Sequence, residues 1–533
     1  LSQTKYNTVA FVWAGVVLGA LMRVRFCLSN QPLWLDEAAL AVNVIERTPL
    51  ELYQPLAFDQ AAPYGFLLLE KLVVSMFGTS EYMLRLLPLA ASVIALVLFF
   101  NLARAYLSEI GAVFGVWLFA VSPPLIEYAA ELKPYSLDVA VTVGLLLLAL
   151  RAGSSPVRHL VLALVGAVAV WLSFPAVFVL AGVLSVSVLA ALLSDRESAL
   201  VRWVPAHLLW ATSFGLYYFT ALISASDNEY LHEFWEAGFA PLVPSLDTLN
   251  WYLTKSWTLF EQVVGLQFLP GLGLLAALAG AASLANRRSV RMLLLIAPAG
   301  VTLAASSLEL WPFEGRLVLF LAPVLIILIA AGGAWLVRSN GARGRAVGGI
   351  LVLAILLLPL KTSLGNVVSP PPGEEARGVL REVFSSKKPG DAVYIYHYTY
   401  PAYRYYAHRY GWPDGLPIPE AIFGGSGRIE GADGTVVISE MGDREWSSFR
   451  RQVREVSTNS RRVWFVFSYL YESPEIEFYR WLLEDLGERC RAFRRNRAEA
   501  YLYWFPSADS TDSFPDGCAG AGTVDSLDSA QSG

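Results

Sequence analysis

The feature that most constrains this chain is a series of apolar segments, each about as long as a helix that crosses a bilayer. A helix of roughly 20 apolar residues spans the hydrocarbon core, because all its backbone hydrogen bonds are made within the segment. We find about eleven such segments by this criterion, at approximately 8–28, 86–105, 111–127, 136–151, 158–173, 175–193, 203–223, 263–284, 290–308, 316–337 and 346–363. The sequence therefore predicts an α-helical polytopic membrane protein.

The composition changes near residue 365. The chain as a whole is 16% charged, against about a quarter in soluble proteins, and the deficit falls before residue 365. After it, Ser369-Pro-Pro-Pro-Gly373 predicts a stiff linker. We therefore predict a transmembrane domain at 1–365, a soluble domain at 366–507 and a disordered tail at 508–533, which is rich in Ser, Asp and Gly.

The soluble domain shows alternating strand and helix patterns, which are typical of an α/β fold. Buried strands are predicted at 391–397, 435–439, 463–467 and 501–505, and helices at 443–456 and 473–486. The tyrosines from 394 to 410, with His397 and His408, are interpreted as a Tyr-rich strand, and a carbohydrate-binding surface is the alternative.

Charges in the short connections predict the orientation. Arginines gather in the turns on one side, which the positive-inside rule makes cytoplasmic: Arg104, Arg151, Arg158, Arg196, Arg202, Arg287, Arg288, Arg291, Arg338, Arg343 and Arg345. The opposite, extracytoplasmic side receives the loops 29–84 and 224–262 and the soluble domain. Arg23 and Arg25 break the pattern, so they either snorkel to the interface or face an anionic ligand.

The first outer loop, 29–84, is too long for a simple connector. It contains a short helix at 49–53 and an apolar stretch at 62–77 that predicts an interfacial helix lying along the membrane surface. Another interfacial segment is predicted in 224–262, where Trp235, Trp251 and Trp257 supply an aromatic belt.

Three stretches place ionisable side chains at the outer boundary. They are Asp36-Glu37, the run Ser122–Ser136 with Glu131 and Lys133, and Leu310–Arg316. A carboxylate base opposite Lys133 and Arg316 is the arrangement that moves a sugar off a lipid phosphate. The base takes the proton of an acceptor hydroxyl, and the cations stabilise charge on the departing phosphate.

These stretches carry a resemblance to a known family. Trp34-Leu-Asp-Glu-Ala38 lies in the first outer loop, Phe77-Gly-Thr-Ser-Glu-Tyr-Met-Leu-Arg-Leu-Leu-Pro88 follows it, and Ser122-Pro and Glu131-Leu-Lys-Pro-Tyr135 come next. In this order they resemble GT-C glycosyltransferases of the protein mannosyltransferase and aminoarabinose transferase kind. The resemblance covers about residues 20–365.

The resemblance implies inverting transfer from a polyprenyl-phosphate sugar to a lipid, polysaccharide or protein acceptor at the extracytoplasmic face of the plasma (inner) membrane. It implies Asp36 as general base, with Glu37 positioning the acceptor or serving as a secondary acid. The implied donor-binding residues are Glu131, Lys133, Tyr135, Arg316, Gln60 and Tyr64. Lys133 stands where the family usually has Arg, and Gln60-Ala-Ala-Pro-Tyr64 matches the family's Gln-Pro-Pro run only loosely.

Other functions were weighed against this one. A non-enzymatic transporter or flippase of a lipid-linked glycan precursor is the alternative, but no internal repeat of the kind transporters show is evident. The net charge of −5 gives no case for nucleic acid. No cofactor is predicted. A divalent metal at Asp227, Glu229, His232 and Glu233 stays open without a recognised ligand spacing, as does a disulfide between Cys490 and Cys518.

The orientation can be tested by labelling. A Gly373→Cys variant should react with a membrane-impermeant thiol reagent added to intact cells, because residue 373 is expected outside the membrane. Labelling only after the cytoplasm is opened would overturn the predicted orientation.

Overall fold

A computed structural model of the chain describes residues 2–153, 155–193, 197–222, 229–285, 289–338, 341–417, 419, 427–431, 434–439, 446–470 and 474–506. The chain forms two compact units. Unit 1 comprises Leu1–Asn30, Ala62–Gly78 and Tyr82–Pro370, and unit 2 comprises Gln31–Ala61, Thr79–Glu81 and Pro371–Gly533. Residues 31–61, which the sequence analysis placed with the membrane domain, thus pack in unit 2.

Unit 1 is helical. Its elements are α1 (Ser2–Cys27), α3 (Tyr64–Phe77), α4 (Glu81–Leu84, entered from unit 2), α5 (Leu86–Tyr106), α6 (Glu109–Val121), α7 (Pro123–Glu127), η2 (Tyr128–Ala130), α8 (Tyr135–Ala152), α9 (Pro156–Leu172), α10 (Ala176–Leu193), α11 (Glu197–Tyr217), η3 (Tyr218–Leu222), α13 (Glu229–Phe234), η4 (Glu236–Gly238), α14 (Leu246–Thr258), η5 (Leu259–Val263), α15 (Pro270–Ala285), α16 (Ser289–Ser307), η6 (Gly315–Leu321), α17 (Ala322–Val337) and α18 (Ala342–Val368).

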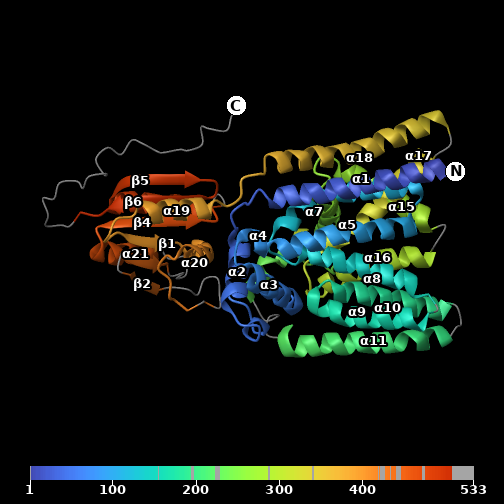
Figure 1. Cartoon of the computed structure of the whole chain (residues 1–533), viewed down its shortest axis with the longest axis horizontal. Coiled ribbons are helices and arrows are strands. Elements are labelled where there is room, and N and C mark those ends of the chain that lie inside the picture. The colour runs from blue at the N-terminus through green and yellow to red at the C-terminus, as the bar shows by residue number, and fades with distance from the viewer. Residues whose placement is uncertain are drawn as a thin grey trace. The chain divides into compact units, whose positions relative to one another are not determined.

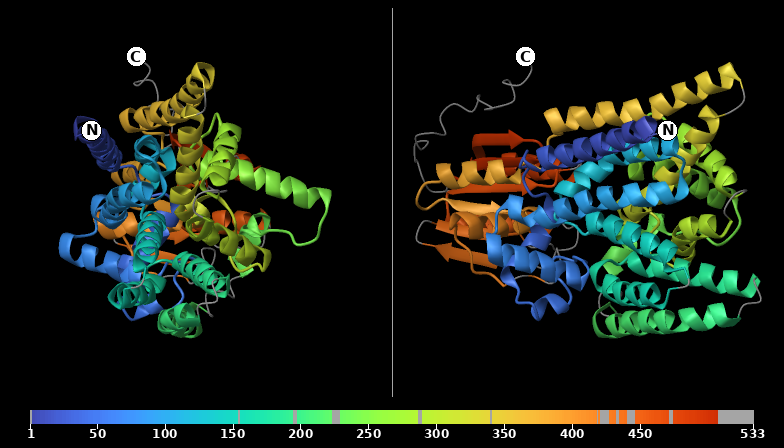
Figure 2. Two further views of the ribbon diagram at one scale, coloured as in Figure 1. Left: turned by 90° about the vertical axis from the view of Figure 1, so that its right-hand side faces the viewer. Right: turned by 45° about the vertical axis from the view of Figure 1, so that its right-hand side comes forward.

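Helices lie at all eleven predicted apolar segments. Among the described residues, seven helices are long and apolar enough to cross a membrane, and α6 with α7 forms an eighth span if the bent pair is counted as one. The shorter apolar helices are α9 and α15. The long helices α1, α5, α8 and α10 run side by side (Figures 1 and 2). The chain is therefore a multi-pass membrane protein, as predicted.

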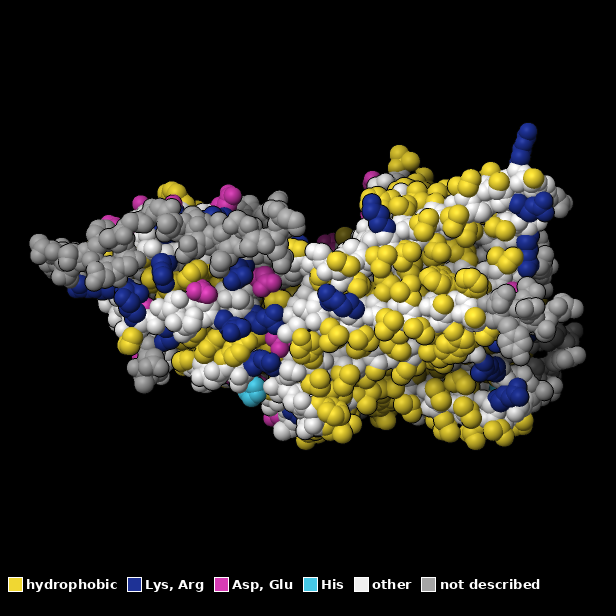
Figure 3. Space-filling view, turned by 45° about the horizontal axis from the view of Figure 1, so that its top comes forward, with side chains coloured by type: hydrophobic (Ala, Val, Ile, Leu, Met, Phe, Trp, Pro, Cys, Tyr) yellow, Lys and Arg dark blue, Asp and Glu magenta, His cyan; other side chains and the backbone are white. Residues whose placement is uncertain are grey.

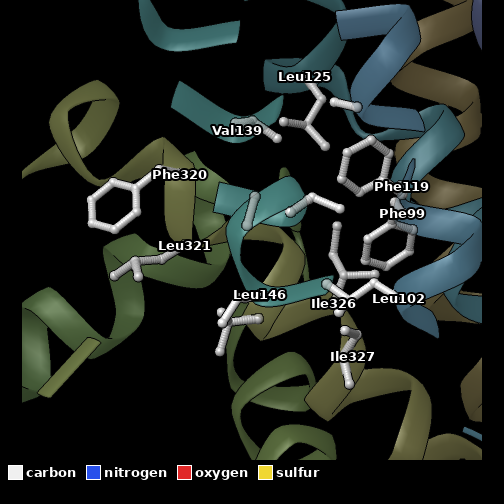
Figure 4. Packing of buried hydrophobic residues seen from close by; sticks show 14 of the residues in the cluster. Phe99, Leu102, Phe119, Leu125, Val139, Leu146, Phe320, Leu321, Ile326 and Ile327 are labelled. Atoms are coloured by element: carbon white, nitrogen blue, oxygen red, sulfur yellow. The ribbon is translucent and has the colours of Figure 1, made fainter. Parts of the chain in front are cut away.

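The core of unit 1 is packed from side chains of several of these helices (Figure 4). The rings of Phe99 on α5 and Phe119 on α6 stack with centroids 4.4 Å apart. Ile326 and Ile327 on α17 are both fully buried in the same cluster. The outer surface is also apolar: hydrophobic side chains cover much of the face of unit 1 seen in Figure 3. On α18, the side chains of Ile350, Leu353 and Leu357 are exposed. An apolar exterior of this kind is stable in contact with lipid.

Arg23 is a buried residue of this core, and both sequence interpretations of it were wrong. Its guanidinium donates to Ser92 Oγ at 2.8 Å and to the carbonyl oxygens of Gly19 at 2.9 Å, Ala120 at 2.9 Å and Phe119 at 3.2 Å. A fully buried guanidinium needs such acceptors to offset the loss of hydration. Arg23 therefore ties α1 to α5 and α6, and it neither snorkels nor faces a ligand.

Unit 2 is a sheet with helices. Its elements are α2 (Leu35–Glu46), η1 (Glu51–Tyr53), α19 (Ala376–Ser386), β1 (Ala392–Ile395), η7 (His397–Thr399), α20 (Tyr400–Tyr410), β2 (Gly427–Gly431), β3 (Gly434–Ile438), α21 (Trp446–Asn459), β4 (Arg462–Ser468), α22 (Pro474–Leu486), β5 (Glu488–Arg495) and β6 (Ala498–Trp504). The strand order is β2-β3-β1-β4-β6-β5.

The centre of this sheet is parallel, and its edges are antiparallel. β1 pairs in parallel with β3 and β4, whereas β2, β5 and β6 pair antiparallel with their neighbours. All four residues of β1 are buried, as expected for a strand covered on both faces. On one face, Tyr394 and Phe465 pack in a cluster with Phe449 of α21 and Leu483 of α22. The predicted α/β domain is therefore present.

Helix α2 packs against α20 within this unit. Arg404 of α20 donates to both carboxylate oxygens of Glu46, at 2.8 and 2.7 Å. Beyond the helix, the fully buried Phe58 contacts the Tyr400 ring edge-on at 5.9 Å. The first outer loop is thus anchored at both the end of α2 and the segment after it.

The strand predictions were correct for β1, β3, β4 and β6, and the helix predictions for α21 and α22. The interpretation of 394–410 as a Tyr-rich strand was wrong beyond Ile395: Tyr400–Tyr410 is the helix α20. Strands β2 and β5 and helix α19 were not predicted. Cys518 and the tail lie outside the described residues.

Close backbone contact between α15 and α17 leads to a test of the packing. A Cβ atom on Gly280 would overlap the carbonyl oxygen of Leu328, and one on Gly332 would overlap that of Ala276. Small residues permit such approach between membrane helices. Gly280→Val should therefore destabilise the folded chain by about 1–3 kcal/mol through overpacking, measured as thermal unfolding in detergent.

The matched control is Gly349→Val on α18, where a Cβ atom meets nothing within 4 Å. Both variants carry the same β-branched side chain in a helix, so propensity cancels. Equal unfolding temperatures for the two variants would contradict the close packing of α15 and α17.

Candidate functional site

The predicted site residues fall in both units. Asp36, Glu37 and Gln60 lie in unit 2, and Tyr64, Glu131, Lys133, Tyr135 and Arg316 lie in unit 1.

Asp36 and Glu37 occupy the first turn of α2. Glu37 is buried, at 1% exposure, and Asp36 is half-buried. Carboxylates in a first turn are stabilised by the positive end of the helix dipole, typically by about 0.3–1 kcal/mol. Both side chains therefore lie at the positive end of the helix dipole.

A third carboxyl group, which the sequence did not single out, lies at the same turn. Oε2 of Glu374 accepts a hydrogen bond from the Leu35 amide at 3.2 Å. Glu374 is buried, at 4% exposure. Burial raises its pKa from the ordinary 4.5 to about 7, and the negative charge of Asp36 adds to the rise, while the Leu35 hydrogen bond opposes it.

Gln60 follows α2 in the same unit. Its side-chain amide donates to the carbonyl oxygen of Phe58 at 3.2 Å. Phe58 and Asp59 both have positive φ, 60° and 51°, so the backbone turns sharply just before Gln60. This turn places Gln60 near the end of the part of the first outer loop that packs in unit 2.

In unit 1, a bend in the chain leads to the predicted donor residues. Helices α6 and α7 meet at 58°, where Ser122-Pro123-Pro124 interrupts the helix. Ser122 Oγ donates to the carbonyl oxygen of Val264 at 2.9 Å, and Gly265, with φ of +85°, packs against both proline rings. The Ser-Pro motif thus forms the break after which Glu131, Lys133 and Tyr135 follow.

Arg316 lies over two aromatic rings in this part of unit 1. Its guanidinium carbon is 5.9 Å from the centroid of the Tyr135 ring and 5.7 Å from that of Trp235. Arg316 and Glu131 both act electrostatically on the Tyr128 hydroxyl, and the Tyr128 ring meets Tyr135 edge-on at 5.2 Å. A guanidinium held over aromatic rings is a cation whose planar N–H groups match the geometry of phosphate and carboxylate oxygens.

Lys133 is two residues from Tyr135 and is buried, at 5% exposure. Its backbone amide donates to the carbonyl oxygen of Glu131 at 2.8 Å. Buried lysine is rare unless its charge is paired or serves a site. The fold therefore brings Glu131, Tyr135 and Arg316 together, with Lys133 in the same short segment.

Other residues of this region were not predicted as partners. Lys255 of α14 forms an ion pair with Glu314, two residues before Arg316. Asn366 of α18 donates to Glu127 at 2.8 Å. Trp235 was predicted as part of an aromatic belt, and in the structure its ring contacts Arg316. No spacing in the sequence links Trp235 to Arg316.

Tyr64 begins α3. Its backbone amide donates to the hydroxyl of Tyr217 at 2.9 Å, and α3 packs against α9 and α5. The predicted helix in 62–77 is therefore present. Gly65 lies against the backbone of Trp171. The start of α3 therefore packs closely against the end of α9.

A metal site has no support from the described residues. Among them, no group of three or more His, Cys, Asp or Glu side chains is placed to hold a metal ion. His232 is instead 3.5 Å from Glu309, and Asp227 lies outside the described residues.

Comparisons with known proteins give the fold. No protein-family model matches the sequence, and no curated protein matches it. The structure is similar to ArnT from Cupriavidus metallidurans in the apo state, with a TM-score of 0.51 and 12% identity over 94% of this chain and 98% of that one. ArnT bound to undecaprenyl phosphate gives a TM-score of 0.52 at 12% identity, over 93% and 97% of the two chains.

A second neighbour is the archaeal oligosaccharyltransferase AglB from Archaeoglobus fulgidus, in complex with an inhibitory peptide and a dolichol-phosphate. Its TM-score is 0.54 at 13% identity, over 96% of this chain and 75% of that one. ArnT and AglB are both GT-C glycosyltransferases. The chain therefore has the GT-C fold, a membrane helical part with a C-terminal sheet domain.

The raised pKa of Glu374 predicts a pH dependence of stability. A carboxyl group with a pKa of about 7 in the folded chain and 4.5 in the unfolded chain favours folding fully below pH 4.5, and this contribution is lost as the pH rises through 7. The free energy of unfolding should fall by on the order of 3 kcal/mol across this window. Glu374→Gln, which does not titrate, should reduce the fall.

The measurement is thermal unfolding of both proteins in detergent at pH 4.5 and pH 8. Parallel changes in unfolding temperature for the wild type and Glu374→Gln would contradict the assignment of this titration to Glu374.

Proposed function

We propose that this chain is an inverting glycosyltransferase that moves a sugar from a polyprenyl-phosphate donor to an acceptor hydroxyl. The observation that carries the proposal is the GT-C fold over 97% of the ArnT chain that binds undecaprenyl phosphate. AglB supports the same class of lipid carrier, since its structure is a complex with a dolichol-phosphate. The acceptor is a lipid, a polysaccharide or a protein at the extracytoplasmic face of the plasma (inner) membrane.

The proposed base is Asp36. Its carboxylate takes the proton of the acceptor hydroxyl while the hydroxyl oxygen attacks the anomeric carbon. The bond from that carbon to the phosphate oxygen breaks, and its electron pair leaves with the polyprenyl phosphate. A single displacement inverts the anomeric configuration. The half-buried position in the first turn of α2 supports this role, because the positive end of the helix dipole favours a negative charge there, and Glu37 is proposed to position the acceptor.

The proposed donor site is the segment of unit 1 around Arg316 and Lys133. Charge grows on the phosphate as the sugar leaves, and fixed cations stabilise that charge in a site from which water is excluded. The guanidinium of Arg316 lies over the rings of Tyr135 and Trp235 and has the planar N–H geometry that suits phosphate oxygens. Lys133 is proposed to supply a second positive charge, as a compact ammonium group and not as a second guanidinium.

The remaining predicted donor residues complete this proposal. Glu131 lies beside the Arg316 and Tyr128 group, where it is suited to orient the cations. Gln60 and Tyr64 are proposed to contact the donor from the first outer loop. No cofactor is included in the proposal.

The test is transfer by purified protein supplied with a polyprenyl-phosphate sugar and acceptor lipid or glycan. Asp36→Asn should lower the transfer rate by about 100- to 10,000-fold, the usual contribution of a general base. Binding of the donor, measured separately, should be retained, because the substitution leaves the cationic segment intact.

The matched control is Asp59→Asn, in the same loop of unit 2. Asp59 has a φ of 51°, and Asn tolerates that conformation as well as Asp does, so transfer should stay near the wild-type rate. Unchanged transfer by Asp36→Asn would eliminate Asp36 as base. Movement of the lipid across vesicles without sugar transfer would favour the transporter alternative.

A further inference from the structure

The first turn of α2 takes its capping group from a distant segment. The first amides of a helix have no partner within it, and a side chain usually supplies one. Here the side chain of the N-cap residue, Trp34, makes no capping hydrogen bond. The Leu35 amide donates to Glu374 at 3.2 Å, 339 residues along the chain.

The residues leading into the turn are held by the same part of unit 2. The side-chain amide of Gln31 donates to the carbonyl oxygen of Pro371 at 2.6 Å. The backbone amide of Leu33 donates to the hydroxyl of Tyr406 at 3.3 Å. With the Glu374 bond, three alternate residues of 31–35 are fixed to the segment 371–374 and to α20. The position of the acidic turn is therefore determined by residues of the C-terminal sequence.

Glu374 lies at the end of a central strand of the sheet. Ser468, the last residue of β4, and Tyr469, which follows it, lie beside the carboxyl group of Glu374, and Tyr469 has a φ of 63°. Glu374 also precedes α19, whose residues Val379 and Leu380 are fully buried. A side chain fixed between a strand end and a helix start has little freedom, which suits it to fix a neighbouring turn.

The carboxyl groups of Glu374 and Asp36 act on each other. The charge of Asp36 disfavours ionisation of Glu374. Glu37 lies in the same turn, and burial raises the pKa of the Tyr406 hydroxyl, which accepts the Leu33 amide. The nearby Arg377 is engaged by Glu81 at 3.1 Å.

From these contacts we infer that Glu374 is a positioning residue for Asp36: it fixes the first turn of α2 by accepting the Leu35 amide. The inference rests on the proposed role of Asp36. By this inference, a residue of the C-terminal sequence helps to place Asp36 of the first outer loop. Glu374 does so without contacting the substrate.

Two substitutions distinguish the effect of the hydrogen bond from the Leu35 amide from the effect of the charge on Glu374. Glu374→Gln keeps an oxygen that accepts the Leu35 amide and removes the charge. Its transfer rate at neutral pH should stay within a few-fold of wild type, because the oxygen that accepts the Leu35 amide is retained. Glu374→Ala removes both, and it should lower kcat by about 100-fold, the cost of misplacing a catalytic group, with the donor KM nearly unchanged.

Hydrogen exchange provides a readout that does not depend on catalysis. Amides of residues 35–38 should exchange faster in Glu374→Ala than in wild type, and those in Glu374→Gln should not. The matched control is Glu455→Gln, which removes a carboxylate of α21 that is 68% exposed and should change neither kinetics nor exchange in α2.

The outcomes distinguish the two proposals. Absence of transfer by every protein, wild type included, would reject the proposed function, while exchange would still decide the capping role. Unchanged exchange at residues 35–38 in Glu374→Ala would overturn the inference. So would equal losses of kcat in Glu374→Gln and Glu374→Ala, because only the second variant lacks the oxygen that accepts the Leu35 amide.

Discussion

The acidic turn of this chain depends on the docking of α2 against the sheet unit. Helix α2 is 12 residues long, too short to be stable alone in water. It is held at its start by the Leu35–Glu374 hydrogen bond and at its end by the two bonds between Arg404 and Glu46. Between these ends, Leu40 and Val44 are fully buried. Tertiary contacts, and not the helix itself, therefore place Asp36.

The fold could be predicted from the sequence wherever burial leaves a strong local pattern. Apolar length located the membrane helices, and strands buried on both faces, such as β1, were recognised as continuous apolar runs. Strand β5 was missed because it carries four arginines on a half-exposed edge. Helix α20 was mistaken for a strand because tyrosine favours strands, while its packing in the unit determines a helix.

The candidate site divides in the same way. Asp36 and Lys133 could be found because short motifs surround them at a membrane boundary. Glu374 could not, because its relation to α2 arises from residues 339 positions apart and leaves no local spacing. Arg23 shows the opposite kind of error. An arginine in an apolar helix suggested a ligand or the membrane interface, whereas hydrogen bonds to carbonyl groups of α6 explain why its side chain is buried.

The division of the chain into units has a consequence for any attempt to excise the soluble domain. The backbone passes from one unit to the other five times, after Asn30, Ala61, Gly78, Glu81 and Pro370. A fragment cloned from Pro371 onward would lack α2 and so expose the side of α20 that α2 covers. Autonomous expression of this sheet would require residues 31–61 to be joined back, for instance as an N-terminal graft or a co-expressed peptide.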